Sequence, residues 1–368
     1  MPSSTSSSER VLPQVPWPGL LAAAVLLFFA AAIGMEMRLD ALGYQPTARD
    51  SQERWQAARA RASRLGERAL ILVGASRFQL GLDLDVLRRE TGLEPVQLAL
   101  DGSGGEPILA GLANDPKIRG TVLVEYYDHT VGARGGVAED MQRRHEKSSG
   151  RLRLWKRPAE RSETRLTEWL HERLNAYADG ANPWSSLRWR ILPAAEARQY
   201  LVTRPDRSRL ADYARVDMPD FYYRRVARTL GEEIDVKGPS IEALLAQRIA
   251  ALKAEDNADF LAASREVGRM AEQIRARGGQ VIFVAMPSSG MVREIERRRY
   301  PRERFWERFV AETGLPGIHS DHEPELRGYA CPDGSHLDVR DRGRYTAALA
   351  DLMKRKGFLA PDQGGTRQ

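Results

Sequence analysis

The sequence predicts an α/β fold, an open parallel sheet with a helical insertion, preceded by one transmembrane helix. Short apolar runs rich in Val, Ile and Leu alternate with segments long enough for helices. This alternation is typical of parallel strands that helices cover on both faces. A long uncharged stretch near the N-terminus predicts the transmembrane helix.

The composition is that of a folded protein, with 42% hydrophobic and 29% charged residues. A length of 368 residues fits one large domain with an insertion. The net charge is +6, but only seven of the 56 basic residues are Lys and the Arg residues are scattered among acids. We therefore predict no nucleic-acid binding. The single Cys331 excludes an intramolecular disulfide and a Cys-based zinc site.

Residues 1–15 are predicted to form an N-terminal tail and residues 16–37 a transmembrane anchor. The stretch from Trp17 to Met35 carries no charge and, at about 1.5 Å per residue, spans a hydrocarbon core. A signal peptide cleaved near Ala30-Ala31-Ala32 and a buried core helix are the alternatives. The preceding region lacks the strongly basic start of a signal peptide, so we favour an uncleaved anchor.

Residues 38–66 are predicted to form a stalk or a first surface helix, because the segment is polar, Arg-rich and helix-favouring. The main folded domain is expected at 67–357 and a polar tail at 358–368. Within the domain, an insertion at about 138–260 is predicted to be helical and to contain no strands. The predicted strands are the apolar runs at 69–74, 95–100, 121–127 and 280–287.

The insertion is rich in tryptophan. Four of the seven Trp residues lie in it: Trp155, Trp169, Trp184 and Trp189. Such side chains, mixed with Arg, stack on sugars or rest at a membrane surface. Packing within a helical subdomain explains them equally well, and both interpretations stay open.

Chemistry is expected beyond the carboxyl ends of the strands, where open parallel sheets bind their ligands. The first apolar run ends in Gly74-Ala75-Ser76-Arg77, immediately before a predicted helix. Ser76 is thereby placed in the positive field of a helix N-terminus, beside N–H groups able to stabilise an oxyanion. A Ser that only caps the helix is the alternative. The second run ends in the glycine-rich segment 101–105, whose backbone can approach a bound group closely.

A second set of candidate residues lies near the C-terminus, in the segment Asp333-Gly334-Ser335-His336. A nucleophilic Ser needs a base to remove its proton, and the base needs a carboxylate to orient it. Asp333 and His336 supply both, and a spacing of three residues over one helical turn predicts that they share a face. A solvated turn with a capping Asp is the alternative.

No metal and no cofactor are predicted. The run His319-Ser320-Asp321-His322-Glu323 contains metal-ligand types, but it is short, acidic and flanked by Pro, which favours a solvated loop. Neither glycine-containing turn matches GxGxxG, so a dinucleotide is not expected.

Three motifs resemble the SGNH (GDSL-like) hydrolase superfamily: GASR with Ser76, the glycine after the second strand, and DGSH with Asp333 and His336. The stretches WQAAR, GASRFQLGLD, and MPSSG through YPRERFW to CPDGSHLDVRD further resemble membrane-anchored SGNH-like proteins related to DltD and to alginate acetylation proteins. This resemblance implies a three-layer α/β/α, flavodoxin-like fold. It also implies that Ser76 is the nucleophile, His336 the general base and acid, Asp333 its orienting carboxylate, and Gly102 an oxyanion donor beside the N–H of Ser76.

One block departs from the family's pattern. The Gly-x-Asn-Asp that follows the third strand in the family is replaced by EYYDHT, so its Asn oxyanion donor is missing and Arg77 is a candidate substitute. The resemblance implies an O-acyltransferase of the inner membrane that faces the periplasm. It would work with a membrane-bound O-acyltransferase partner and transfer an acyl group, commonly acetyl, to a polysaccharide acceptor. An esterase and a non-catalytic scaffold are the alternatives, and both stay open.

Overall fold

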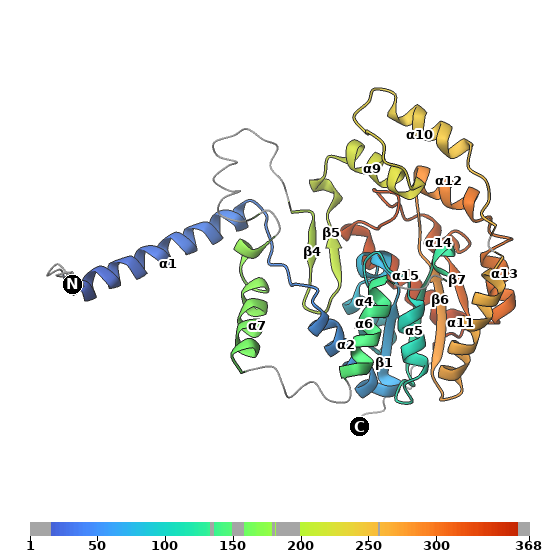
Figure 1. The fold of residues 1–368 in the computed structure, drawn as a ribbon, viewed down its shortest axis with the longest axis horizontal. Helices are drawn as coiled ribbons and strands as arrows, with labels where there is room; N and C mark the ends of the chain where they lie inside the picture. The colour runs from blue at the N-terminus through green and yellow to red at the C-terminus, as the bar shows by residue number, and fades with distance from the viewer. Residues whose placement is uncertain are drawn as a thin grey trace, which may run out of the picture.

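A long N-terminal helix extends from an α/β body in the computed structural model of the chain (Figure 1). The structure describes residues 16–132, 136–148, 158–178, 181, 199–256 and 258–359. The predicted tail at 1–15 and three of the insertion's Trp residues, Trp155, Trp184 and Trp189, lie outside the described residues.

The body is built on a five-stranded sheet in the order β2-β1-β3-β6-β7, and every neighbouring pair is parallel. The strands are β1 (Ala69–Val73), β2 (Glu94–Gln97), β3 (Thr121–Tyr126), β6 (Gln280–Ala285) and β7 (Gly317–His319). The first four confirm the predicted strands to within a few residues at their ends. The sequence did not predict β7, because three residues are too short to form a recognisable apolar run.

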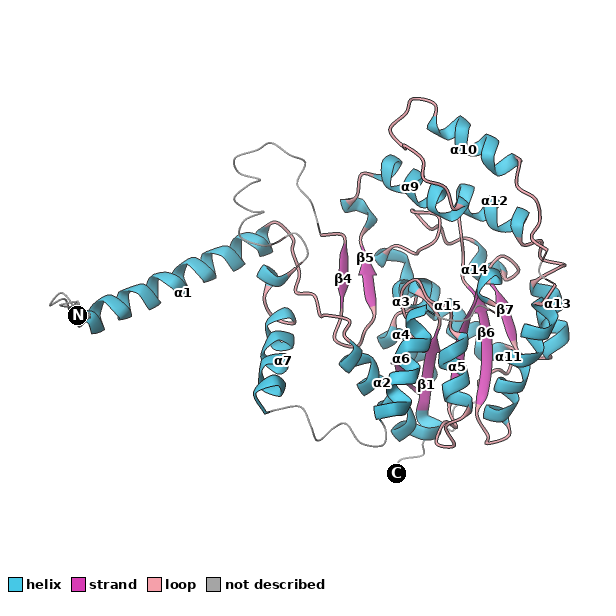
Figure 2. Ribbon diagram, in the orientation of Figure 1, coloured by secondary structure: helices cyan, strands magenta, loops and turns pink. Residues whose placement is uncertain are grey.

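Helices cover both faces of the sheet (Figure 2). On one face lie α2 (Gln52–Leu65), α5 (Glu106–Ala113), α6 (Gly136–Ser148), α11 (Phe260–Arg275) and α13 (Trp306–Thr313). On the other lie α3 (Ser76–Gly81), α4 (Leu84–Thr91), α14 (Pro324–Arg327) and α15 (Val339–Arg355). Strand residues alternate between the two cores: Ile71 and Val73 join the first, Leu70 and Leu72 the second.

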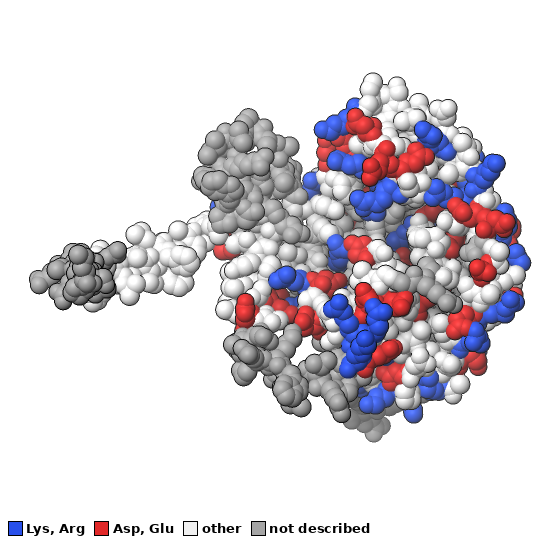
Figure 3. All heavy atoms as spheres, viewed as in Figure 1, with Lys and Arg blue, Asp and Glu red and all other residues white. Residues whose placement is uncertain are grey.

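The N-terminal helix α1 (Trp17–Ala41) is long and apolar enough to cross a membrane. It continues four residues beyond the predicted anchor end at 37. In Figure 3 most of its visible surface carries no charged side chain.

Of the two alternatives predicted for 38–66, the stalk is wrong, and a helix of the body, α2, occupies most of the segment. Trp55 on α2 is fully buried, and its Nε1 donates to the Leu98 carbonyl at 3.0 Å. Arg59, one turn further along, is also buried and pairs with Asp115 at 3.1 Å. The C-terminal limit shifts as well, because Phe358 and Leu359 pack against the second core although a polar tail was expected from 358.

The insertion is not wholly helical, which corrects the prediction for 138–260. It contains an antiparallel hairpin, β4 (Leu201–Thr203) and β5 (Arg209–Ala211). The hairpin escaped the sequence pattern because its strands have three residues each and are mostly half-buried. Its helices are α6, α7 (Pro158–His171), α9 (Met218–Leu230) and α10 (Ile241–Ala250). Helices α9 and α10 form a small core with α12 (Gly290–Arg299). Short 3-10 turns complete the chain: η1 (Gly66–Arg68), η2 (Asp128–Thr130), η4 (Asn175–Tyr177) and η5 (Tyr213–Arg215).

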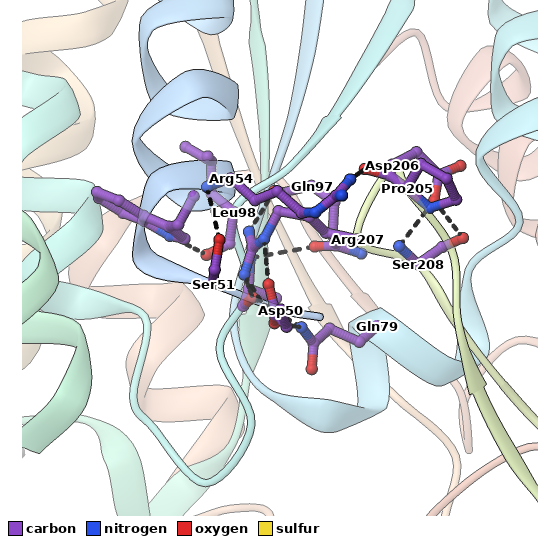
Figure 4. Close-up of polar contacts among 12 residues, drawn as sticks. Asp50, Ser51, Arg54, Gln79, Gln97, Leu98, Pro205, Asp206, Arg207 and Ser208 are labelled. Carbon is purple, nitrogen blue, oxygen red and sulfur yellow. Dashed lines mark hydrogen bonds and ion pairs between the residues drawn. The ribbon is translucent and has the colours of Figure 1, made fainter. Parts of the chain in front are cut away.

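Arg207, in the turn of the hairpin, joins three parts of the chain (Figure 4). Its Nε donates to Asp50 at 2.6 Å, Nη1 to the Gln97 carbonyl at 2.6 Å and Nη2 to the Ala99 carbonyl at 3.2 Å. Gln79 of α3 donates to the same Asp50 carboxylate at 3.2 Å. The segment between α1 and α2 is therefore fixed to the hairpin and to the end of β2.

Candidate active site

Ser76, His336 and Asp333 form one hydrogen-bonded chain. Ser76 Oγ lies 2.8 Å from His336 Nε2, and His336 Nδ1 lies 2.8 Å from Asp333 Oδ2. Ser76 is the first residue of α3, directly after β1, and the other two lie in the loop before α15. His336 and Asp333 are buried, whereas Ser76 is half-buried. This arrangement is the one that a nucleophilic Ser, a base and an orienting carboxylate require.

The loop around Asp333 is a turn, not the helical turn that the sequence predicted. Asp333 Oδ1 accepts the N–H groups of Ser335 at 2.9 Å and His336 at 2.8 Å. An Asp side chain that bonds the backbone two and three residues ahead closes such a turn by itself. The carboxylate therefore shapes the loop that brings His336 back to it, and no helix is needed.

Glu125 on β3 holds the turn that carries Ser76. Its buried carboxylate accepts the N–H of Ala75 at 2.6 Å and that of Phe78 at 3.4 Å through Oε2. A Cβ on Gly74 would lie 2.3 Å from the Glu125 Cβ, so only glycine allows this approach. Burial raises the pKa of Glu125, although the Arg77 charge and the two N–H groups oppose this effect.

Gly102 lies in the loop after β2 with a φ of +67°, a conformation that favours glycine. The loop runs beside the Ser76 turn, because the N–H of Leu100 donates to the Gly74 carbonyl at 2.9 Å. Among the described residues, neither Gly102 N–H nor Ser76 N–H is paired with a protein acceptor. Both groups are therefore free to donate to a bound atom.

Arg77 points to the other side of the site. Its guanidinium pairs with Glu296 of α12 and lies 4.2 Å from the centre of the Tyr127 ring. Together these side chains border a cavity of about 370 Å³ at the carboxyl ends of β3, β6 and β7. The contacts of Arg77 are thus with Glu296 and Tyr127, and its role as a substitute oxyanion donor stays a prediction.

Two side chains of the insertion lie close to the Asp333 carboxylate. Arg225 on α9 places Nη2 3.3 Å from Asp333 Oδ2, and burial together with the nearby Asp333 carboxylate raises the pKa of the Tyr213 hydroxyl. Although burial opposes it, the hydrogen bond from His336 and the charges of His336 and Arg225 hold the pKa of Asp333 well below its usual range. Asp333 is therefore ionised and able to stabilise an imidazolium.

Burial lowers the pKa of His336, and the charges of Arg225 and Arg77 lower it further against the opposing effect of Asp333. A neutral imidazole at neutral pH is the form that accepts a proton from Ser76. Cys331, although close, is no rival nucleophile, because burial raises the pKa of its thiol to about 12.

The sequence did not predict that Glu125, Tyr213 or Arg225 would lie at the site. Glu125 carried a signal, a lone acid inside the apolar run of β3. Arg225 and Tyr213 carried none, because only the tertiary fold brings them to Asp333. In the stretches of chain that the structure describes, no three His, Cys, Asp or Glu side chains are grouped to hold a metal. In the segment 319–323, which contains metal-ligand types, the rings of His319 and His322 are stacked with their centres 4.3 Å apart.

No family model matches the chain, and no curated protein matches it. What the site does chemically must therefore be inferred from its own atoms.

Proposed function

We propose that the chain is a membrane-anchored O-acyltransferase of the SGNH type that works through an acyl-enzyme on Ser76. The observation that supports this most directly is the hydrogen-bonded chain from Ser76 through His336 to Asp333. The position of Ser76 after β1, beside two unpaired N–H groups, supports the same chemistry.

In the first half-reaction, Ser76 Oγ attacks the acyl carbonyl and gives its proton to His336 Nε2. Asp333 stabilises the resulting imidazolium. The N–H groups of Ser76 and Gly102 donate to the oxyanion, which collapses with cleavage of the bond to the donor group. That leaving group takes the proton from His336, and the acyl group remains as an ester on Ser76.

In the second half-reaction, a hydroxyl of the acceptor gives its proton to His336 and attacks the acyl ester. The tetrahedral species collapses, Ser76 recovers its proton, and the acylated acceptor leaves. We propose an extracytoplasmic polysaccharide as acceptor, acetyl as the acyl group and a membrane-bound O-acyltransferase as the partner that supplies it. The body would lie on the periplasmic side of the inner membrane. The apolar α1 and the resemblance to anchored SGNH-like proteins support this arrangement.

Water resolves the same acyl-enzyme in an esterase, so hydrolysis is the rival to transfer. The test measures the O-acyl content of the host's extracellular polysaccharide in strains that carry the wild type, Ser76→Ala or Ser240→Ala at matched expression. Ser240 is an exposed Ser before α10 and serves as the matched control.

Transfer predicts lower acylation with Ser76→Ala only. Higher acylation in that strain would identify an esterase. Unchanged acylation would contradict the proposal and favour the scaffold.

A further inference from the structure

Helix α7 stands beside the α/β body and exposes large apolar side chains. Leu166 is 57% exposed and Trp169 49%. Tyr177, in the turn η4 that follows, is also exposed, and its ring lies 4.8 Å from that of His171 at the end of α7. Soluble surfaces tolerate single exposed apolar residues, but a group of them marks a contact surface.

Leu166 and Trp169 share one face of α7. Leu166, Trp169 and Leu170 follow the i, i+3, i+4 spacing of a single helical stripe. A different face carries Glu168 and Glu172, which pair with Arg54 of α2 and so tie α7 to the body. The apolar stripe therefore faces away from the body.

The level of α7 along α1 is set by Glu36. The uncharged stretch of α1 ends at Met35, so Glu36 is the first charged residue beyond it. Its carboxylate accepts the N–H groups of Asn175 at 2.8 Å and Ala176 at 2.9 Å, both in η4. The last turn of α7 is thereby held at the level where α1 leaves an apolar environment.

A small core reinforces this junction. It consists of four buried residues, Leu39 and Tyr44 from the end of α1 and the segment after it, and Ala178 and Ala181 from the segment after η4. Figure 1 shows α7 next to the body-side end of α1 and running across its direction. A helix that lies across a membrane-spanning helix, at the level where the spanning stretch ends, lies along the membrane surface.

We infer that α7 is an interfacial helix that inserts Leu166 and Trp169 among the lipid headgroups of the membrane that α1 crosses. The inference rests on the proposed membrane anchoring and not on acyl transfer. Trp and Tyr concentrate at this depth of a bilayer. Arg173, whose guanidinium lies 5.4 Å from the Trp169 ring centre, adds a cation at the level of the phosphates.

A lipid surface fits this stripe better than a protein partner does. A stable protein interface buries about 800 Å² on each partner, whereas a few aromatic and aliphatic side chains suffice for an interfacial helix. The turn η4, which follows α7, also hydrogen-bonds to Glu36 at the end of the apolar stretch of α1. Together, α1 and α7 attach the protein to the membrane at two places.

The test uses the full chain in nanodiscs of phosphatidylethanolamine and phosphatidylglycerol. Single cysteines replace Leu166 or Trp169, and an environment-sensitive maleimide fluorophore reports their surroundings. Leu26→Cys in α1 is the positive control. Leu244→Cys on α10, where Leu is 37% exposed, is the negative control. Cys331 is buried, and the parent chain carried through the same labelling gives the background from its thiol.

Labels at 166 and 169 are expected to shift to shorter emission wavelength and to be quenched by doxyl lipids, with no such change at 244. The inference is overturned if labels at 166 and 169 behave like 244 while the label at 26 is quenched. Protection at 166 in native membranes but not in lipid-only nanodiscs would identify a protein occupant and overturn it as well. Lack of quenching at 26 would contradict the insertion of α1 into the membrane, on which the inference rests.

Circular dichroism of each variant confirms that the exposed substitutions leave the fold unchanged. Acylation of the polysaccharide can stay unchanged with Ser76→Ala although the labels at 166 and 169 are quenched. The two proposals therefore stand or fall separately.

Discussion

Asp333 organises the candidate site with its two carboxylate oxygens. Oδ1 closes the loop through two backbone N–H groups, and Oδ2 orients His336 and receives Arg225. Because both oxygens must accept, an amide at this position cannot replace the carboxylate.

Asp333→Asn is expected to lower kcat for hydrolysis of p-nitrophenyl acetate by about 10⁴-fold, because the amide favours the wrong imidazole tautomer. The purified full chain is assayed, with Asp256→Asn at a fully exposed position as the control. A loss of less than about tenfold would mean that His336 does not depend on this carboxylate.

Arg225→Gln is expected to change the pH dependence of the same reaction. Arg225 lowers the pKa of His336, so its removal raises that pKa, and the active neutral imidazole is reached only at higher pH. Activity at about pH 5.5 therefore falls more than activity at about pH 8. Arg225→Lys keeps the charge and is expected to restore the profile. Arg228→Gln, at an exposed position of α9, is expected to leave it unchanged.

At this scale the sequence predicted which residues would meet but not what surrounds them. Ser76 was predictable from small residues between an apolar run and a helix, and His336 from its spacing to Asp333. The helical reason given for that spacing was wrong, since the loop is closed by hydrogen bonds of the Asp333 side chain. Arg225 was unpredictable, because a charged residue in a charged helix has no periodicity that reveals a distant buried partner.

Two hydrogen bonds from backbone N–H groups to Glu125 on β3 hold the turn that carries Ser76. Glu125→Ala is expected to destabilise the fold by about 2–4 kcal/mol, because two N–H groups of the turn lose their acceptor. Glu125→Gln keeps an acceptor of the same size and serves as the control. Urea unfolding followed by circular dichroism measures both variants, and equal stability of the two would contradict the role of the acceptor.

Glu125 is also expected to make the free energy of unfolding depend on pH in a definite direction. Burial raises the pKa of Glu125, so its contribution to stability is full below the unfolded pKa and is lost as pH rises through the folded pKa. The wild type is therefore expected to lose stability relative to Glu125→Gln as pH rises through that interval.

The Arg207 contacts fasten the segment before α2 to the hairpin. Arg207→Ala is expected to destabilise the protein by about 3 kcal/mol, because Asp50 and two carbonyls lose a buried partner. Arg204→Ala in the same hairpin is expected to cost little, because the Arg204 side chain is 42% exposed and its ion pair with Asp85 is 3.6 Å long. Amide exchange at Ala48, whose N–H bonds to Thr203, is expected to speed up in Arg207→Ala only.

At the scale of elements, strand length decided what the sequence revealed. The four long apolar runs predicted their strands, whereas β4, β5 and β7 have three residues each and leave too little pattern. Helix α2 was taken for a stalk because its buried face consists of Trp55, Arg59 and Ala62 in an Arg-rich surrounding. A buried Arg reads as polar in the sequence although Asp115 pairs with it in the fold.

For the whole molecule, α1, the one helix among the described residues that is long and apolar enough to span a membrane, predicts one location for the body that follows it. A C-terminal alkaline phosphatase fusion is expected to be active, because the body is proposed to lie in the periplasm and alkaline phosphatase folds only there. A β-galactosidase fusion at the same position is the reciprocal control and is expected to be inactive. The reverse pattern would place the body in the cytoplasm and overturn the proposed localisation.

The hydrogen bond between Ser76 and His336 joins residues 260 positions apart in the chain. At synthesis rates of about 5–20 residues per second, the serine precedes its base by roughly 13–52 s. A nascent or truncated chain that ends before Asp333 therefore holds a nucleophile with nothing to deprotonate it. The proposed reactivity therefore arises only when the loop before α15 has been synthesised, close to the end of translation.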